Sequence, residues 1–452
     1  EQQQQTSFSP DSFLFNKPRD TCNLEHYFAY PTSSSLFSLS PSSLHSLSLF
    51  SPSSIYEHPP DKIVKFYCQG KCYGLGDVLN GLVSVVLLAV FSNHKVGVDI
   101  HRPPLHKYYQ YPPSFVVDQP MHYSRPFRCF NSEQTKTVSP KVIGGTIFNP
   151  DFDYKAETNA KFVSYMVANN SVLLPKIHKV FHTYDPEVII GCVLRFLLKP
   201  LPEVLNPVAT LLERVKKDDV LIGLHIRAGD DSERHRRTSL DVIEEFLGCY
   251  KEHLGDKIDE YYTYLAVDSK ESYEVVERNI KSSRIFSYSE HHKDPGHSDK
   301  CYKTGNCKYV HQRTVVEHYL LSQVDSLIRS RSGFSTTAAY MGGHYGLILL
   351  PEFCDCVKGR TIEEFIEIKN GKKVPIWTRE KCGLGEERES ERGREKSRWT
   401  PELNLGLHQS GREVFHKIGG FFRDTFPMGK EGETQKETET QRETQRERER
   451  EI

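Results

Sequence analysis

The sequence predicts an α/β protein with two Rossmann-like lobes that face a cleft, flanked by disordered ends. Two regions carry this prediction. Residues 63–100 alternate strand, glycine-rich turn, apolar helix and strand, and a second alternating series begins at Val220. A strand, a helix and a second strand in succession form a βαβ unit, which implies a parallel sheet. The two series show no internal repeat, and we place the N-terminal lobe at 62–205 and the C-terminal lobe at 206–383.

Apolar runs divide the N-terminal lobe into elements. A glycine-rich turn from Gly70 to Asp77 leads into an apolar helix. The segment 101–160 is rich in Pro, Tyr and His, so we expect irregular structure there. The predicted elements are strands at 63–68 and 95–100 and helices at 78–91, near 161–168 and near 185–198.

The C-terminal lobe begins with the strongest signal, a near-continuous apolar strand at 220–226. Apolar residues at 240, 243, 246, 247 and 250 follow the helical period and predict an amphipathic helix. The other segments alternate in the same way. They are strands at 261–267, 284–286, 326–328 and 347–350, and helices at 240–254, 272–280, 311–321 and 336–342.

Composition sets the ends apart and excludes some classes of function. The 452 residues include 59 basic and 60 acidic side chains, so a function that depends on bulk attraction to nucleic acid or anionic lipid is excluded. Residues 1–55 are Ser-rich and residues 384–452 are charged, and we expect both ends to be disordered. The longest apolar run, 82–91, is too short to span a membrane. Because the chain starts at Glu1, we expect membrane attachment only through an anchor missing upstream.

The eleven cysteines favour an oxidising compartment. The sequon at Asn169 points the same way, because glycosylation at such a site occurs in the secretory pathway. We therefore expect a glycoprotein with disulfide bonds in the secretory pathway, in the Golgi lumen. The closely spaced pairs that suit local disulfides are Cys68/Cys72, Cys301/Cys307 and Cys354/Cys356.

Three short segments lie where predicted strands end, which is the edge of the sheet where such folds bind ligands. In the first, Gly74-Leu75-Gly76-Asp77, glycines let the backbone approach a ligand, and the helix that follows offers unpaired N–H groups. The alternative is a tight turn without a ligand. The segment does not complete a GxGxxG fingerprint, because position 79 is Leu.

The second segment runs from His225 to Asp230 and ends the strongest strand. Strand alternation places His225 and Arg227 on one face. The guanidinium of Arg227 is suited to hold a diphosphate through two hydrogen bonds, and Asp230 can orient Arg227 or bind the ligand. The alternative is a strand-end ion pair among the charges of 230–237.

The third segment, Ser332 to Thr337, brings hydroxyl groups to the start of a helix. Such a segment is a helix N-cap, and it can also bind phosphate. Because it lies in the same lobe as Arg227, the two segments together predict a diphosphate site that includes Ser335 and Thr336.

The order of these segments resembles that of the fucosyltransferases that use GDP-fucose. These include plant xyloglucan fucosyltransferases, bacterial chitooligosaccharide and animal core α1,6-fucosyltransferases, and protein O-fucosyltransferases. The similarity covers about 64–355 in patches and is greatest to the plant enzymes at 317–343, in the pattern E-x-Y-L-L-S-x-x-D…S-T-F-G…G-G. The matching residues are Glu317, Tyr319-Leu320-Leu321-Ser322, Asp325, Phe334 and Gly342-Gly343.

The resemblance implies a GT-B-like fold, inversion at carbon 1 of fucose, and no metal ion. It also implies roles for individual residues of the donor site. Arg227 matches an arginine that binds the β-phosphate of GDP, and His225 matches a position that lines the donor site. Asp268 matches an acidic residue near guanine or ribose, whereas Ser335 and Thr336 match hydroxyls that bond the diphosphate.

Two positions depart from the family pattern. Asp77 and Val78 stand where the family usually has Asn-Arg, and Ala228 replaces a second arginine of the α1,6 group. The acceptor is a glycan or glycoprotein by this resemblance, and the loops at 101–160 carry no acceptor motif.

The residues suit fucose transfer, because departure of GDP needs positive charge and N–H donors on the leaving diphosphate. Arg227 and the helix that starts near Ser335 can supply both without Mg²⁺ or another cofactor. Our candidate base for the acceptor hydroxyl is Asp230, with Asp77 second. A DxD sequence occurs only at 151–153, outside the predicted donor lobe.

Three alternatives remain open from the sequence. One is a relative that binds carbohydrate or nucleotide sugar without turnover, and another is a transferase for a different nucleotide sugar. The third is a zinc site in the His/Cys-rich loop, although a disulfide with surface histidines suits the spacing better. The residues of that loop are His291, His292, His297, Cys301, Cys307 and His311.

Overall fold

The computed structural model describes the folded body of the chain, and all described residues belong to one compact unit. The expected disordered ends, 1–55 and 384–452, lie outside the described residues except for Leu384. The described residues are 62–68, 74–92, 94–100, 103–112, 115–117, 124–129, 148, 151–158, 162–169, 173–228, 238–280, 284–288 and 307–384.

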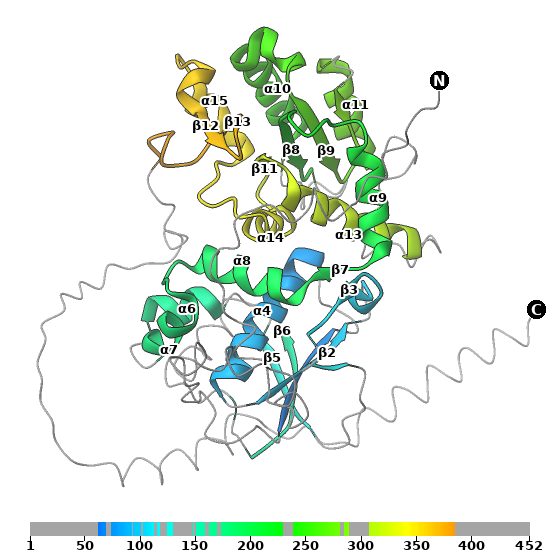
Figure 1. Cartoon of the computed structure of the whole chain (residues 1–452), viewed down its shortest axis with the longest axis vertical. Helices are drawn as coiled ribbons and strands as arrows, with labels where there is room; N and C mark the ends of the chain where they lie inside the picture. Colours follow the sequence, from blue (N-terminus) through cyan, green and yellow to red (C-terminus); the bar gives the residue numbers. More distant parts are fainter. Residues whose placement is uncertain are drawn as a thin grey trace, which may run out of the picture. The chain divides into compact units, whose positions relative to one another are not determined.

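The first sheet has five parallel strands in the order β4-β2-β1-β6-β5 (Figure 1). The central strand, β1, pairs with β2 along its whole length, from Ile63 opposite Lys95 to Cys68 opposite Ile100. The predicted strands 63–68 and 95–100 are confirmed. The bounds are β1 Ile63–Cys68, β2 Lys95–Ile100, β4 Val116–Val117, β5 Arg125–Cys129 and β6 Tyr154–Thr158.

Two expectations for this region are wrong. The segment 101–160 is not irregular throughout, because it contributes β4, β5 and β6 to the sheet. Helix α4, Leu75–Phe91, begins three residues earlier than expected, so Gly76 and Asp77 lie in its first turn. All its residues except Asp77 are buried, which accounts for an apolar pattern on every side.

The second sheet has four parallel strands in the order β10-β9-β8-β11. Residues alternate across β8: Ile222 and Leu224 belong to one apolar cluster and Leu221 to another. The sheet is therefore buried on both faces, as expected for parallel strands. The bounds are β8 Leu221–Ile226, β9 Tyr262–Val267, β10 Ile285–Phe286 and β11 Ser326–Arg329.

Helices α10 and α11 pack against each other, as do α13 and α14 (Figure 1). Each lies close to its predicted position, and Ser332 caps α14 by accepting a hydrogen bond from Phe334 N–H at 3.3 Å. The bounds are α10 Leu240–Leu254, α11 Lys270–Asn279, α13 Cys307–Gln323 and α14 Gly333–Met341.

The remaining elements include several that the sequence analysis did not predict. The expected strand at 347–350 is wrong, because Leu347 and Leu349 form only isolated bridges and Leu350 starts a 3-10 turn. The helices are α6 Phe162–Asn169, α7 Leu174–Phe181, α8 Pro186–Leu197, α9 Pro202–Leu212 and α15 Phe353–Val357, with 3-10 turns at Leu105–Lys107, Gly255–Asp259, Leu350–Glu352 and Ile362–Phe365. The paired strands are β3 Tyr109–Gln110 with β7 Lys199–Pro200, and β12 Ile366–Lys369 with β13 Lys372–Pro375.

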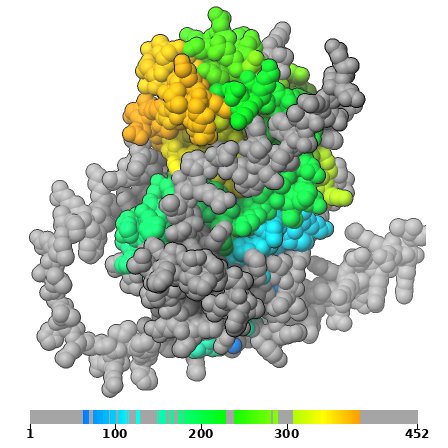
Figure 2. Space-filling view, in the orientation of Figure 1, coloured from blue at the N-terminus to red at the C-terminus, as the bar shows by residue number. Residues whose placement is uncertain are grey.

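Disulfides join segments that are distant in sequence. Cys249 of α10 bonds Cys354 of α15, and Cys356 bonds Cys382. The expected local pair Cys354/Cys356 is therefore wrong, since the two residues have different partners. Figure 2 shows the yellow and orange segment that contains α15 beside the green surface of α10. Cys68, Cys192 and Cys307 are also disulfide-bonded.

In the described part of the chain, the helices are too short or too polar to cross a bilayer.

Candidate functional site

The carboxyl ends of β8 and β9 hold an ion pair between two of the predicted donor residues. Arg227 Nη1 contacts Asp268 Oδ2, and the other carboxylate oxygen accepts a hydrogen bond from Ala228 N–H at 2.9 Å. Both side chains are about one-sixth exposed. The predicted alternative, an ion pair among the charges of 230–237, lies outside the described residues. The pair with Asp268 orients a partly exposed guanidinium at the sheet edge where ligands bind.

Ser330 connects three of the predicted residues. Its hydroxyl accepts a hydrogen bond from Arg227 N–H at 2.8 Å and lies 3.3 Å from Nδ1 of His225. Its N–H donates to the carbonyl of His225 at 3.0 Å, and its own carbonyl accepts from Ser335 Oγ at 3.3 Å. Ser330 is fully buried, so these bonds fix the strand ends relative to α14.

His225 is a buried, neutral side chain. Burial first, and then the charges of Arg227 and Arg329, lower the pKa of His225 to about 3. Its ring packs against the ring of Phe334 of α14 in a tilted arrangement, at a centroid distance of 5.3 Å. Ser330 Oγ, which accepts a hydrogen bond from Arg227 N–H, also lies within hydrogen-bonding distance of Nδ1. A hydroxyl can donate one hydrogen bond and accept two, so it pairs with either neutral tautomer of the ring. A pKa this low makes His225 a poor general base near neutral pH.

The hydroxyls at the start of α14 bond to protein groups. Ser335 is fully buried and donates to the carbonyl of Ser330. Thr336 donates to the carbonyl of Ser332 at 2.7 Å and accepts from Arg329 Nη1 at 3.0 Å. The hydroxyls of Ser335 and Thr336 thus stabilise the start of α14, and that of Thr336 also binds the guanidinium of Arg329. Their bonds to a diphosphate stay a prediction.

The first and third segments meet in the structure. A Cβ on Gly76 would lie 2.1 Å from the carbonyl carbon of Gly333 and 2.2 Å from the nitrogen of Phe334. The close approach that glycine permits at this position is therefore to another helix start. Gly74 has open space around it, and Asp77 Oδ1 lies 3.5 Å from the position of a Cβ on Gly333. Asp77 is thereby placed beside the N-terminus of α14.

The predicted acidic residues do not come together. Asp230, the candidate base, lies outside the described residues, so its role stays a prediction. Asp325 accepts a hydrogen bond from Leu221 N–H at 3.0 Å, at the amino edge of the sheet, whereas Asp268 follows the carboxyl end of β9. Asp153 of the DxD sequence accepts from Ile63 N–H at 2.8 Å, which is a structural role.

The His/Cys-rich loop lies mostly outside the described residues. Cys307 is disulfide-bonded and His311 is buried, which favours the disulfide interpretation over a zinc thiolate. Among the described residues there is no group of three or more side chains placed to hold a metal ion.

Sequence reasoning missed a buried ion pair beneath the site. Arg313 donates to Glu317 at 3.0 Å and to the carbonyl of Val267, the residue before Asp268, at 2.8 Å. Burial raises the pKa of Glu317, and the charge of Arg313 opposes that rise. This pair supports the end of β9 and gives the family-like Glu317 a structural role. The i,i+4 spacing on a predicted helix was the available signal.

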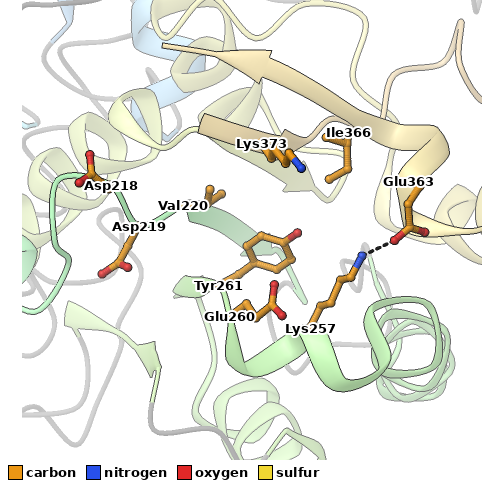
Figure 3. A pocket seen from close by; sticks show the side chains of 9 residues that line it. All are labelled: Asp218, Asp219, Val220, Lys257, Glu260, Tyr261, Glu363, Ile366 and Lys373. Atoms are coloured by element: carbon orange, nitrogen blue, oxygen red, sulfur yellow. Dashed lines mark hydrogen bonds and ion pairs between the residues drawn. The ribbon is translucent and has the colours of Figure 1, made fainter. Parts of the chain in front are cut away.

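A cavity of about 560 Å³ lies at the opposite, amino edge of the second sheet. Figure 3 shows Lys257 directed at Glu363 across it. None of the predicted site residues lines this cavity. Its lining residues are Asp218, Asp219, Val220, Lys257, Glu260, Tyr261, Glu363, Ile366 and Lys373.

Among solved structures, the chain is similar to fucosyltransferases. A mutant of FUT1 from Arabidopsis thaliana in complex with GDP is 14% identical, with 64% of this chain and 70% of that chain covered and a TM-score of 0.45. Fucosyltransferase NodZ from Bradyrhizobium is 13% identical over 61% of this chain and 92% of that chain, with a TM-score of 0.40. A glycosyl transferase family 9 protein from Veillonella parvula is 13% identical over 64% and 79%, with a TM-score of 0.31. No model of a protein family and no curated protein matches the chain.

Proposed function

We propose that this chain is a glycosyltransferase that moves fucose from GDP-fucose to a glycan or glycoprotein acceptor, with inversion at carbon 1 and without a metal ion. We further propose that the two parallel sheets belong to the two lobes of a GT-B-like fold. The observation that carries the proposal is the guanidinium of Arg227, held by Asp268 at the carboxyl edge of the second sheet, while the backbone N–H of Arg227 bonds to Ser330, two residues before the N-cap of α14.

In the proposed reaction, the bond between carbon 1 of fucose and the β-phosphate oxygen breaks as an acceptor hydroxyl attacks the opposite face. The leaving diphosphate gains negative charge in the transition state, so fixed donors there lower the barrier. Arg227 supplies charge and hydrogen bonds, and the first turn of α14 supplies N–H groups and a positive dipole end. Asp230, or Asp77 beside α14, takes the proton of the acceptor.

The arrangement of the carboxylates that the structure describes supports a mechanism without a metal ion. Both oxygens of Asp268 are engaged by Arg227 and by Ala228 N–H, and Asp325 lies at the other edge of the sheet. A bound Mg²⁺ needs oxygen ligands that converge. The charge of the diphosphate is instead met by a guanidinium and a helix N-terminus.

The disulfides support a place in the secretory pathway, which we propose to be the Golgi lumen. Cys249–Cys354 and Cys356–Cys382 cross-link the second sheet region, and such bonds persist in oxidising compartments. Localisation of a tagged chain together with marker proteins of the Golgi tests this part of the proposal, and a cytosolic signal contradicts it.

Binding to a panel of nucleotides tests the donor assignment. We expect calorimetry to show that GDP binds more tightly than UDP and ADP, and that Arg227→Ala weakens GDP binding. A hydrogen bond to a charged group contributes about 1.5–3 kcal/mol, so the loss should be about 10- to 100-fold. Arg278→Ala removes an exposed arginine at the end of α11 and serves as the control. Equal binding of the three nucleotides, or an unchanged affinity in Arg227→Ala, contradicts the assignment.

A further inference from the structure

A second arginine lies at the same sheet edge as Arg227. Arg329 is the last residue of β11, and it pairs in register with His225 of the neighbouring strand. Residues in register on parallel strands share a face, and so do residues two apart on one strand. Arg329, His225 and Arg227 therefore lie on one face, on strands about 4.8 Å apart.

The guanidinium of Arg329 is held in place from one side. Nη1 donates to Thr336 Oγ1 at 3.0 Å, and that hydroxyl donates to the carbonyl of Ser332 at 2.7 Å. Thr336 belongs to the first turn of α14, so the cation lies at the positive end of the helix dipole. The guanidinium of Arg329 and the N-terminus of α14 therefore place positive potential at the same point.

The charge of Arg329 is not compensated within the part of the chain that the structure describes. Its Nε is buried and has no hydrogen-bond acceptor, and no described carboxylate lies within ion-pair distance of it. Arg227 differs, because it is paired with Asp268. A partly buried guanidinium without an anion is unfavourable, and a bound anion removes that penalty.

We propose that Arg329 is the second cation of the donor diphosphate site, binding the leaving group from β11 while Arg227 binds it from β8. This inference rests on the proposed function. Two guanidinium groups and a helix N-terminus on one face suit a ligand with two or more negative charges. The proposal also explains why the hydroxyl of Thr336 bonds to a protein group and not to the ligand. This hydroxyl orients Arg329, and Arg329 in turn binds the phosphate.

Calorimetry on the full chain with GDP, GMP, guanosine and inorganic pyrophosphate tests the role of Arg329. Arg329→Gln keeps a polar side chain of similar shape without the charge, and Arg329→Lys keeps the charge without the planar fork. Arg278→Gln is the matched control on the surface of α11. The melting temperature of each variant shows that it is folded, and Arg329→Lys provides a second measurement if Arg329→Gln is not.

We expect Arg329→Gln to weaken GDP binding about 10- to 100-fold, to weaken GMP binding less, and to leave guanosine binding unchanged. Arg329→Lys should lie between that variant and the unmodified chain. The salt dependence of GDP binding should also become less steep, as expected when one cation is removed from an anion site.

Equal losses for GDP, GMP and guanosine would contradict a phosphate contact and assign Arg329 a structural role. GDP affinity within twofold of the unmodified chain in Arg329→Gln would overturn the proposal while leaving the assignment of Arg227 intact. Pyrophosphate binding that depends on Arg329, without preference for GDP, would support the anion site and refute the proposed function. A chain that binds neither GDP nor pyrophosphate would overturn both.

Discussion

Substitution of Gly76 by Ala tests whether the two helix starts must touch. Gly76 lies in the first turn of α4, and a Cβ there would lie 2.1 Å from the carbonyl carbon, and 2.4 Å from the carbonyl oxygen, of Gly333. Ordinary carbon contacts are about 3.5 Å or longer. The start of α4 or of α14 must therefore move by about 1.4 Å, because backbone atoms cannot rotate away as a side chain can.

The magnitude follows from overpacking and from helix propensity. Overpacking in a tight site costs typically about 1–3 kcal/mol, and contact with backbone places Gly76→Ala at the upper end of that range. Alanine in a helix regains up to about 1 kcal/mol relative to glycine. We expect a net loss of about 2 kcal/mol in the free energy of unfolding. A displacement of this size near the proposed diphosphate site should also lower the transfer rate about 100-fold.

Denaturant unfolding and GDP-fucose turnover measure both effects, with Gly74→Ala as the matched control. Gly74 has a negative φ of −75° and open space around its Cα, so Ala fits there and should change stability by less than about 1 kcal/mol. If Gly76→Ala matched Gly74→Ala in stability and in rate, the close packing of α4 on α14 could not be what the glycine at 76 provides.

Three further predictions concern the site. Ser330→Ala should lower the transfer rate about 10-fold or more, by removing the hydrogen bonds of its hydroxyl to His225 and to the N–H of Arg227. Ser326→Ala, at the start of β11, removes a buried hydroxyl that has no hydrogen-bond partner among the described residues, so it should leave the rate unchanged; equal effects of the two substitutions would contradict the role of Ser330. The pKa of His225 is about 3 in the folded chain against about 6.5 when unfolded, so unfolding takes up a proton there and stability falls as the pH drops from about 6.5 towards 3. His225→Gln should reduce this acid-side slope by up to about 1.4 kcal/mol per pH unit in unfolding curves, and an unchanged slope would show that His225 is not held neutral. Transfer should persist in excess EDTA and gain less than about twofold from Mg²⁺ or Mn²⁺, since an arginine and a helix N-terminus meet the diphosphate; a tenfold loss that one divalent metal restores would refute this mechanism.

Hydrophobic periodicity predicted the helices and strands in which apolar residues recur regularly. The strands 63–68 and 95–100 and the helix 240–254 agree with the structure residue for residue. The start of α4 was misplaced because glycine usually marks a turn, whereas Gly76 serves contact between helices. Strand β6 was missed although alternate residues are buried, because Lys155 and Glu157 interrupt its apolar character.

The relative placement of site residues was predictable where both residues belong to one segment of the chain. His225 and Arg227 share a strand, and alternation alone places them on one face. The pairing of Arg227 with Asp268 and the contacts of Ser330 join different strands, so no spacing within one segment indicates them. The same holds for Cys249–Cys354, whose partners are 105 residues apart and meet only when α10 packs on α15.

The most direct test of the account is transfer of fucose from labelled GDP-fucose to an array of glycans by the purified chain, with GDP-mannose and UDP-galactose as competing donors. We predict that fucose is transferred to at least one acceptor with inverted configuration, that the other donors are not used, and that Arg227→Ala transfers about 100- to 1,000-fold more slowly. GDP binding without release or transfer of fucose would instead identify a nucleotide-sugar-binding relative. Transfer from another donor, or transfer at an unchanged rate by Arg227→Ala, would contradict the central claim that Arg227 stabilises a departing GDP.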